Sequence, residues 1–115
     1  MLGRTHRFHG YNSLRAVYRR GRTLRGPMLS LKYATDRPGR PYRVGIVVGR
    51  KVSKSAVVRN RIRRRLYGLV RTQLNAERAR GHDLVFTGYD ERLASIEYDQ
   101  LKAIVADLLQ KAGLL

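Results

Sequence analysis

Arginine is concentrated in one segment of the chain, residues 50–71, in a pattern suited to binding phosphate. The segment reads RKVSKSAVVRNRIRRRLYGLVR. A guanidinium group is planar and always charged, and it can form paired hydrogen bonds with phosphate oxygens or stack on an exposed base. Asn60, inside the cluster, can donate and accept, as contact with a base edge or a 2′-hydroxyl requires. The chemistry open to this segment is recognition of a polyanion.

The acids that usually accompany exposed arginines are absent from this part of the chain. The protein has 25 Lys and Arg against 8 Asp and Glu, a net charge of +17, yet no acid lies between Asp36 and Glu77. Residues 1–76 alone carry +19 and residues 77–115 carry −2. Like charges one helical turn apart repel by a few tenths of a kcal/mol per pair, so an anionic partner is expected to relieve them. We therefore predict nucleic-acid binding through phosphate neutralisation, with a merely solvated charged face as the alternative.

A long helix is expected to position these side chains, from about Ala56 to about Arg80. Ser53 or Ser55 is its predicted N-terminal cap, and Gly81 ends it. At 100° per residue, the apolar stripe consists of Val58, Ile62, Leu66, Leu69 and Gln73. The opposite face carries Asn60, Arg61, Arg64 and Arg71, and the stripe is flanked by Arg59, Arg63 and Arg65, whose stems can pack while their charged ends emerge.

The remaining elements indicate a single α+β domain, residues 1–115, with helices against a small mixed β-sheet. A first helix runs from Asn12 or Ser13 to about Arg20 and ends at Gly21. Residues 28–34 and 42–48 alternate as strands and are predicted to form an antiparallel hairpin, with a further short strand at 24–26. Residues 82–87 form an apolar strand inside the sheet, and a last helix follows residues 90–95, with Leu101, Ile104, Val105 and Leu108 as its buried stripe. The expected order is α-β-β-(β)-α-β-α.

Composition sets limits on other functions. The absence of cysteine excludes disulfides and thiolate metal sites, and no apolar run approaches the ~20 residues of a membrane helix. Residues 1–10 are expected to be a basic, flexible N-terminus without the apolar stretch of a signal peptide, so a cytoplasmic protein is expected. His6, His9 and His82 lack ligand spacing, and the acids are scattered, so neither a metal site nor a catalytic residue is predicted.

The basic loop followed by Ala-Val-Val-Arg-Asn-Arg-Ile-Arg-Arg at residues 56–64 resembles the signature of the bacterial ribonuclease P protein family. The first helix with Leu14 and Tyr18, the late Asp-Leu-Val-Phe strand and the Leu-rich final helix are similar too, so the resemblance covers nearly the whole chain. The chain departs from the family at Tyr67-Gly68, where relatives commonly have Arg-Glu. The resemblance implies a sandwich like ribosomal protein S5 domain 2, with a left-handed βαβ crossover, against the usual right-handed rule.

The resemblance also implies a mechanism. The protein would assist an endoribonuclease in which ribonuclease P RNA removes the 5′ leader of precursor tRNA, with Mg²⁺ bound mainly by RNA and no membrane or obligate protein partner. The RNA-binding residues would be Arg50, Lys51, Lys54, Arg59, Asn60, Arg61, Arg63, Arg64 and Arg65. A leader-binding cleft between the first helix and the sheet would be lined by Leu14, Tyr18, Lys32 and Tyr33.

Four alternatives to these expectations stay open, one about the cleft and three about the class of protein. Leu14 and Tyr18 could simply pack in the core rather than line a cleft. The chain could be a structural RNA-binding protein of the ribosomal type, or a basic DNA-binding protein, although it has no recognisable helix-turn-helix or zinc-finger pattern. A protein nuclease that acts without RNA is the third class, and the scattered acids and histidines speak against it.

Overall fold

The structure, a computed structural model, describes residues 11–35 and 38–115. The expected flexible N-terminus, residues 1–10, lies outside the described residues. Among those described, no helix is long and apolar enough to span a membrane. The elements are α1 (Tyr11–Arg20), β1 (Arg22–Arg25), β2 (Leu29–Ala34), β3 (Arg43–Val48), α2 (Ala56–Gln73), α3 (Ala76–Ala79), β4 (Asp83–Gly88), the 3₁₀ helix η2 (Glu91–Ala94) and α4 (Tyr98–Lys111).

The four strands form one mixed sheet in the order β1-β2-β4-β3. β2 is antiparallel to both β1 and β4, whereas β3 pairs in parallel with β4. The predicted hairpin between residues 28–34 and 42–48 is therefore wrong, because β4 lies between these strands. The reason is burial: Leu84, Val85 and Phe86 are all fully buried, so β4 is apolar on both faces and belongs at the centre of the sheet. The hairpin that does form joins β1 to β2.

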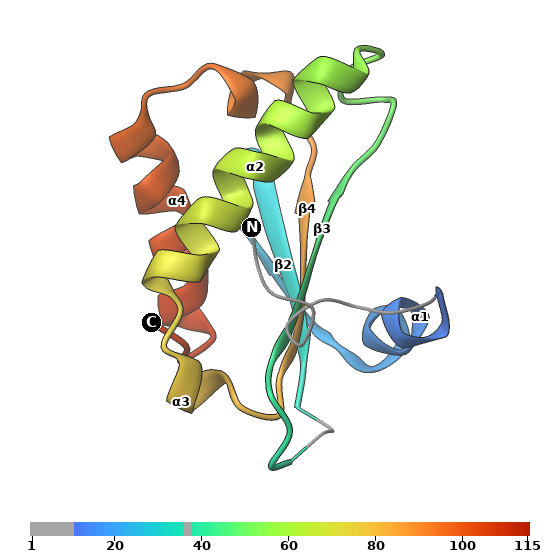
Figure 1. The fold of residues 1–115 in the computed structure, drawn as a ribbon, viewed down its shortest axis with the longest axis vertical. Coiled ribbons are helices and arrows are strands. Elements are labelled where there is room, and N and C mark those ends of the chain that lie inside the picture. The colour runs from blue at the N-terminus through green and yellow to red at the C-terminus, as the bar shows by residue number, and fades with distance from the viewer. Residues whose placement is uncertain (1–10, 36–37) are drawn as a thin grey trace.

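Helices cover both faces of the sheet, which confirms the α+β class. Figure 1 shows the sheet nearly edge on, with α2 and α4 on one side and α1 on the other. The larger core lies on the α2 and α4 side, where Leu31 and Phe86 meet Ile62 and Leu66 of α2. The connection from β3 through α2 to β4 is a parallel crossover, as expected; its left-handed sense stays a prediction from the resemblance.

The first helix ends where the sequence predicts. The backbone N–H of Gly21 donates to the Val17 carbonyl at 2.7 Å, and a Cβ at position 21 would lie 2.6 Å from that oxygen. Only glycine fits so close an approach, and the chain can therefore turn directly from α1 into β1.

The central helix ends earlier than expected, at Gln73 rather than near Arg80. Leu74 is extended and buried, and the side chain of Asn75 accepts hydrogen bonds from the N–H groups of Glu77 and Arg78, which starts α3. The Asn75 N–H also donates to the Leu114 carbonyl at 2.8 Å, so the break is fixed by the end of the chain. In contrast, the predicted apolar stripe of α4 is confirmed as buried.

Candidate RNA interface

Helix α2 is a fixed platform with one buried and one exposed side. The Ser55 hydroxyl accepts a hydrogen bond from the Val58 N–H at 3.3 Å, which confirms one of the two predicted caps. The buried side chains are Ile62, Leu66, Leu69 and Val70, while Asn60, Arg61, Arg64 and Arg71 are exposed. The helix thus offers its most polar face to solvent, as the periodicity predicts, with Val70 as a buried position that the prediction did not include.

Three of the arginines on α2 bind the protein's own backbone. Arg59 donates from Nη1 to the Ser53 carbonyl at 2.9 Å, and Arg63 donates from Nη2 to the Val48 carbonyl at 3.2 Å. Arg65 donates to two carbonyls, those of Leu93 and Ile96, each at 2.6 Å. Hydrogen bonds from a charged donor stabilise by about 1.5–3 kcal/mol each, so these groups fix the neighbouring loops. Arg65, predicted to bind RNA, therefore has a structural role as well.

Two other arginines on the helix carry charge that nothing in the described chain neutralises. Arg61 and Arg64 are exposed, and within residues 11–35 and 38–115 their guanidinium groups form no hydrogen bond or ion pair. Asn60 is bonded to one of the backbone-binding arginines: its Oδ1 accepts a hydrogen bond from Arg63 Nη1 at 2.8 Å. Asn60 is exposed, and within the described residues its amide N–H groups donate no hydrogen bond, so they are available to a ligand beside Arg61 and Arg64. This arrangement is preorganised for phosphate oxygens and for one polar group of a nucleotide.

The loop before α2 extends the basic surface. A hollow of about 640 Å³ is lined by Arg50, Lys51, Lys54, Ala56 and Arg59. Arg50, Lys51 and Lys54 are exposed, and they form no ion pair with any described residue. The structure thus brings the predicted loop cations next to Arg59, one of the predicted helix cations.

A second hollow on α2 includes residues that the sequence analysis missed. It measures about 510 Å³ and is lined by Val57, Asn60, Arg63, Arg64 and Tyr67. Val57 is 69% exposed, which is unusual for a valine within a charged helix. The 3.6-residue period that placed Asn60 and Arg64 together also places Val57 and Tyr67 on that face, so the signal was present. These two side chains add an apolar floor on which a base or sugar can rest.

The structure places Tyr18 and Lys32, two residues of the cleft predicted beside α1, next to each other. Val17 is buried and anchors α1 to the sheet, whereas Leu14 is half-buried and Tyr18 is 42% exposed. The Lys32 ammonium lies 5.6 Å from the centroid of the Tyr18 ring, within the range of a cation–π contact. Since Val17 fills the core, Leu14 and Tyr18 are left available at the surface, together with Lys32.

Tyr33 does not belong to this cleft, contrary to the prediction. Successive residues of a strand point to opposite faces of the sheet, so Tyr33 points away from the side that Lys32 occupies. Its ring packs against the larger core and lies 6.5 Å from the His82 ring, centroid to centroid.

The shifted pKa values belong to residues other than those predicted to bind RNA. Hydrogen bonds from the Arg92 side chain and backbone lower the pKa of Asp90 to about 2, at the start of η2, and the same pair raises the pKa of Arg92. Burial raises the pKa of Tyr42, an effect that the charge of Arg71 opposes. The geometry of these surfaces suits binding by fixed charges.

The comparison with known protein families agrees with this geometry. The sequence model of the ribonuclease P protein family matches residues 2–113. The chain belongs to this family. It is 41% identical over 112 residues to the ribonuclease P protein component of Roseiflexus castenholzii, covering 97% of the chain and 89% of that relative. It is 39% identical over 118 residues to that of Synechococcus sp. (strain JA-2-3B'a(2-13)), covering 100% of the chain and 87% of the relative.

Solved structures show the same fold. The Staphylococcus aureus RNase P protein superposes with a TM-score of 0.74 at 16% identity, over 95% of this chain and 96% of that one. The Thermotoga maritima RNase P protein gives a TM-score of 0.72 at 22% identity, over 85% and 89%. As a ribonuclease P protein, the chain has a role in that enzyme, and its basic surface fits RNA binding. The ribosomal-type and DNA-binding alternatives are thereby set aside.

Proposed function

We propose that this protein is the non-catalytic subunit of ribonuclease P and docks on ribonuclease P RNA through α2 and the loop before it. The observation that carries the proposal is the division among the arginines. Arg59, Arg63 and Arg65 hold the loops around α2 by hydrogen bonds, while Arg61 and Arg64 are left exposed and unpaired within the described chain. A rigid, uncompensated cationic face suits docking on folded RNA, because little side-chain ordering is needed on binding.

The α1 side of the sheet is the proposed site for the 5′ leader of precursor tRNA. Tyr18 offers an exposed ring, Leu14 an adjoining apolar edge and Lys32 a cation close to that ring. Stacking of a base on an aromatic ring contributes about 1–3 kcal/mol and tolerates any sequence. Leaders of precursor tRNAs are single-stranded but differ in sequence, so a site that stacks any base suits them.

The chemistry itself is assigned to the RNA. Magnesium, when bound in the holoenzyme, supplies charge neutralisation and an activated water for phosphodiester hydrolysis. Among residues 11–35 and 38–115, no group of three or more His, Asp or Glu is placed to hold a metal ion. The described side chains do not fit a metal centre, so we assign magnesium binding to the RNA. The proposed compartment is the cytoplasm, where tRNA precursors are made in bacteria.

Reconstitution tests the docking proposal. Purified protein should restore cleavage of precursor tRNA by ribonuclease P RNA at a magnesium concentration where the RNA alone is inactive. Arg64→Gln should weaken assembly with the RNA, whereas Lys102→Gln, which removes one exposed charge from α4, should leave it unchanged. Equal effects of the two substitutions would show that net charge alone matters and would reject the α2 surface.

Two tyrosines provide a matched test of the leader site. Tyr18 and Tyr98 are both exposed on helices, at 42% and 57%, but only Tyr18 lies beside Lys32. Tyr18→Ala should weaken holoenzyme binding of precursor tRNA by roughly 5- to 100-fold without changing binding of mature tRNA. The reason is that only the precursor carries leader bases that can stack on this ring. Tyr98→Ala should change neither. A loss on both substrates would contradict the leader assignment while leaving docking through α2 intact.

A further inference from the structure

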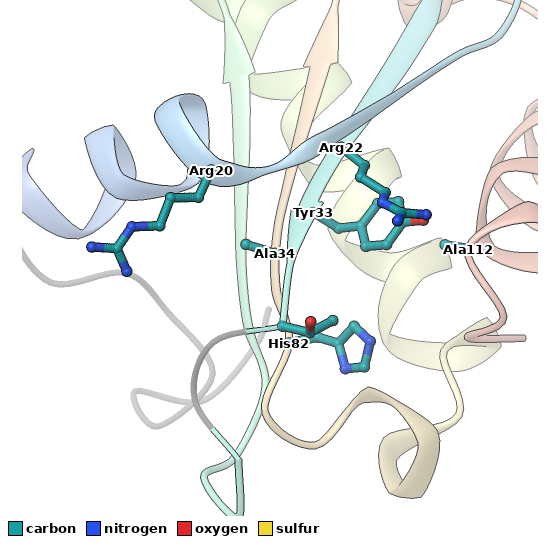
Figure 2. Close-up of a pocket in the computed structure, with 7 residues that line it drawn as sticks. Arg20, Arg22, Tyr33, Ala34, His82 and Ala112 are labelled. Atoms are coloured by element: carbon teal, nitrogen blue, oxygen red, sulfur yellow. The ribbon is translucent and has the colours of Figure 1, made fainter.

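A separate hollow lies at one end of the sheet, below the C-terminal end of α4. It measures about 360 Å³, and its lining includes Arg20, Arg22, Tyr33, Thr35, His82 and Ala112 (Figure 2). Tyr33 points to the sheet face opposite Lys32, so the aromatic side of this hollow lies away from Tyr18, while Arg20 and Ala34 line its side towards α1. The α2 surface does not reach it, because none of its lining residues belongs to α2 or the basic loop.

Two aromatic rings form one wall of the hollow. The rings of Tyr33 and His82 lie 6.5 Å apart between centroids, with their planes inclined by 24°. Both side chains are half-buried. His82 Nδ1 lies 3.2 Å from the Arg80 carbonyl. A carbonyl can only accept, so Nδ1 donates and Nε2 faces the other way. Tyr33 lies in β2 and His82 immediately precedes β4, so the sheet holds the two rings with their planes nearly parallel.

A cation stands next to this surface. Arg22 is the cross-strand partner of Tyr33 in the β1–β2 ladder, and Figure 2 shows its side chain on the same side as the two rings. Arg22 is exposed, and among the described residues its guanidinium forms no hydrogen bond or ion pair. Arg20, at the end of α1, extends away from the rings in Figure 2 and adds positive charge on the far side of the hollow.

We propose that this hollow binds one nucleotide of single-stranded RNA, with the base against Tyr33 and His82 and the phosphate on Arg22. A flat aromatic wall beside an unpaired guanidinium is complementary to the two unlike parts of a nucleotide. A volume of about 360 Å³ is near the lower limit for small-ligand sites, so it suits one nucleotide rather than a longer stretch. The inference extends the proposed function, because it adds a third RNA contact on the face of the sheet away from the leader cleft.

The test uses adenosine 5′-monophosphate as the probe and the full-length protein, followed by NMR of the aromatic side chains. The Tyr33 and His82 ring signals should shift on titration. Arg22→Ala and Tyr33→Leu should each weaken binding on the order of 10-fold, since leucine keeps apolar packing but removes the aromatic face. Arg25→Ala is the matched control: it removes an exposed arginine from the same strand, but from the opposite face. Equal weakening by Arg25→Ala, or shifts confined to Tyr18, would overturn the proposal.

The RNA that supplies the nucleotide is identified with the reconstituted holoenzyme. If the leader supplies it, Arg22→Ala should weaken binding of precursor tRNA with a long leader and spare one with a short leader. If the catalytic RNA supplies it, the same substitution should weaken protein–RNA assembly without substrate. Either result supports the site, and no effect on either RNA would refute it. Because Arg61 and Arg64 are intact in this variant, α2 docking can succeed while the nucleotide site fails.

Discussion

Arg64 and Arg65 are neighbours in the sequence, yet the structure predicts opposite consequences when each is replaced by alanine. Arg65 donates two hydrogen bonds, to the Leu93 and Ile96 carbonyls, whereas Arg64 is exposed and binds nothing in the described chain. The Arg65→Ala variant should therefore lose stability and the Arg64→Ala variant should lose RNA affinity.

The magnitudes follow from the contacts. Two charge-assisted hydrogen bonds contribute about 1.5–3 kcal/mol each, and partial rehydration of the freed carbonyls reduces the total loss to about 2–4 kcal/mol. With an m-value of about 1.5 kcal/mol/M in urea, the unfolding midpoint of Arg65→Ala should fall by about 2 M. Arg64→Ala should change the free energy of unfolding by less than about 0.5 kcal/mol. Its effect should instead be on RNA binding, where one lost phosphate contact reduces the slope of log K against log salt by about 0.7–0.9.

Two assays separate these outcomes. Urea unfolding followed by circular dichroism reports stability, and filter binding to ribonuclease P RNA across a salt series reports the slope. For Arg65→Ala, the salt slope should match that of the unmodified protein under conditions where the variant is folded. A reduced slope for Arg65→Ala together with an unchanged unfolding midpoint would refute the division of the arginines into structural and RNA-binding groups.

Three further predictions concern the fold. Asp83 is buried and accepts two 2.8 Å hydrogen bonds from Arg43, so Asp83→Ala should cost about 3–5 kcal/mol in urea unfolding by removing both charge-assisted bonds of this largely buried pair; a loss below 1 kcal/mol would contradict this. Within the described residues, the buried Oε1 of Gln73 has no partner, while its Nε2 donates an exposed hydrogen bond to the Lys102 carbonyl at 3.3 Å. Water can replace that exposed bond, so Gln73→Met should raise the free energy of unfolding by roughly 0.5–1.5 kcal/mol, and a decrease would count against it. Arg92 holds the pKa of Asp90 near 2, so carbon-detected NMR titration of Arg92→Ala should show that pKa rising toward 3.8. Because the folded pKa is lowered, this pair stabilises the fold above about pH 3.8 and ceases to do so as the pH falls through 2, and an unchanged Asp90 pKa in the variant would disprove the cause.

Helical periodicity was sufficient to predict the two sides of α2. Ile62 and Leu66 are buried while Arg61 and Arg64 are exposed, because the 3.6-residue repeat is local and needs no knowledge of the rest of the fold. The end of the same helix was missed, although Asn75 is a common capping residue and Glu77 follows it. The early end depends on contact with Leu114, which is distant in sequence.

Local periodicity could not predict which strands pair or which groups the arginine side chains bind. The apolar run at residues 84–86 indicated an internal strand, but which strands flank it is decided by packing across the whole sheet. Similarly, nothing near Arg65 in the sequence points to carbonyls about 30 residues away. Tyr33 is a different case: strand alternation alone places it opposite Lys32, so the sequence could have separated these two residues.

The position of β4 has a consequence for how the domain can be assembled. β1 and β2 on one side and β3 on the other share no hydrogen-bonded ladder, and β4 is the sole strand that joins them in the described sheet. During synthesis, the β1–β2 hairpin, β3 and α2 are therefore without a completed sheet until residue 88 has left the ribosome. Fragments that stop before residue 83 should not fold, so none of the proposed RNA-binding surfaces should form in them.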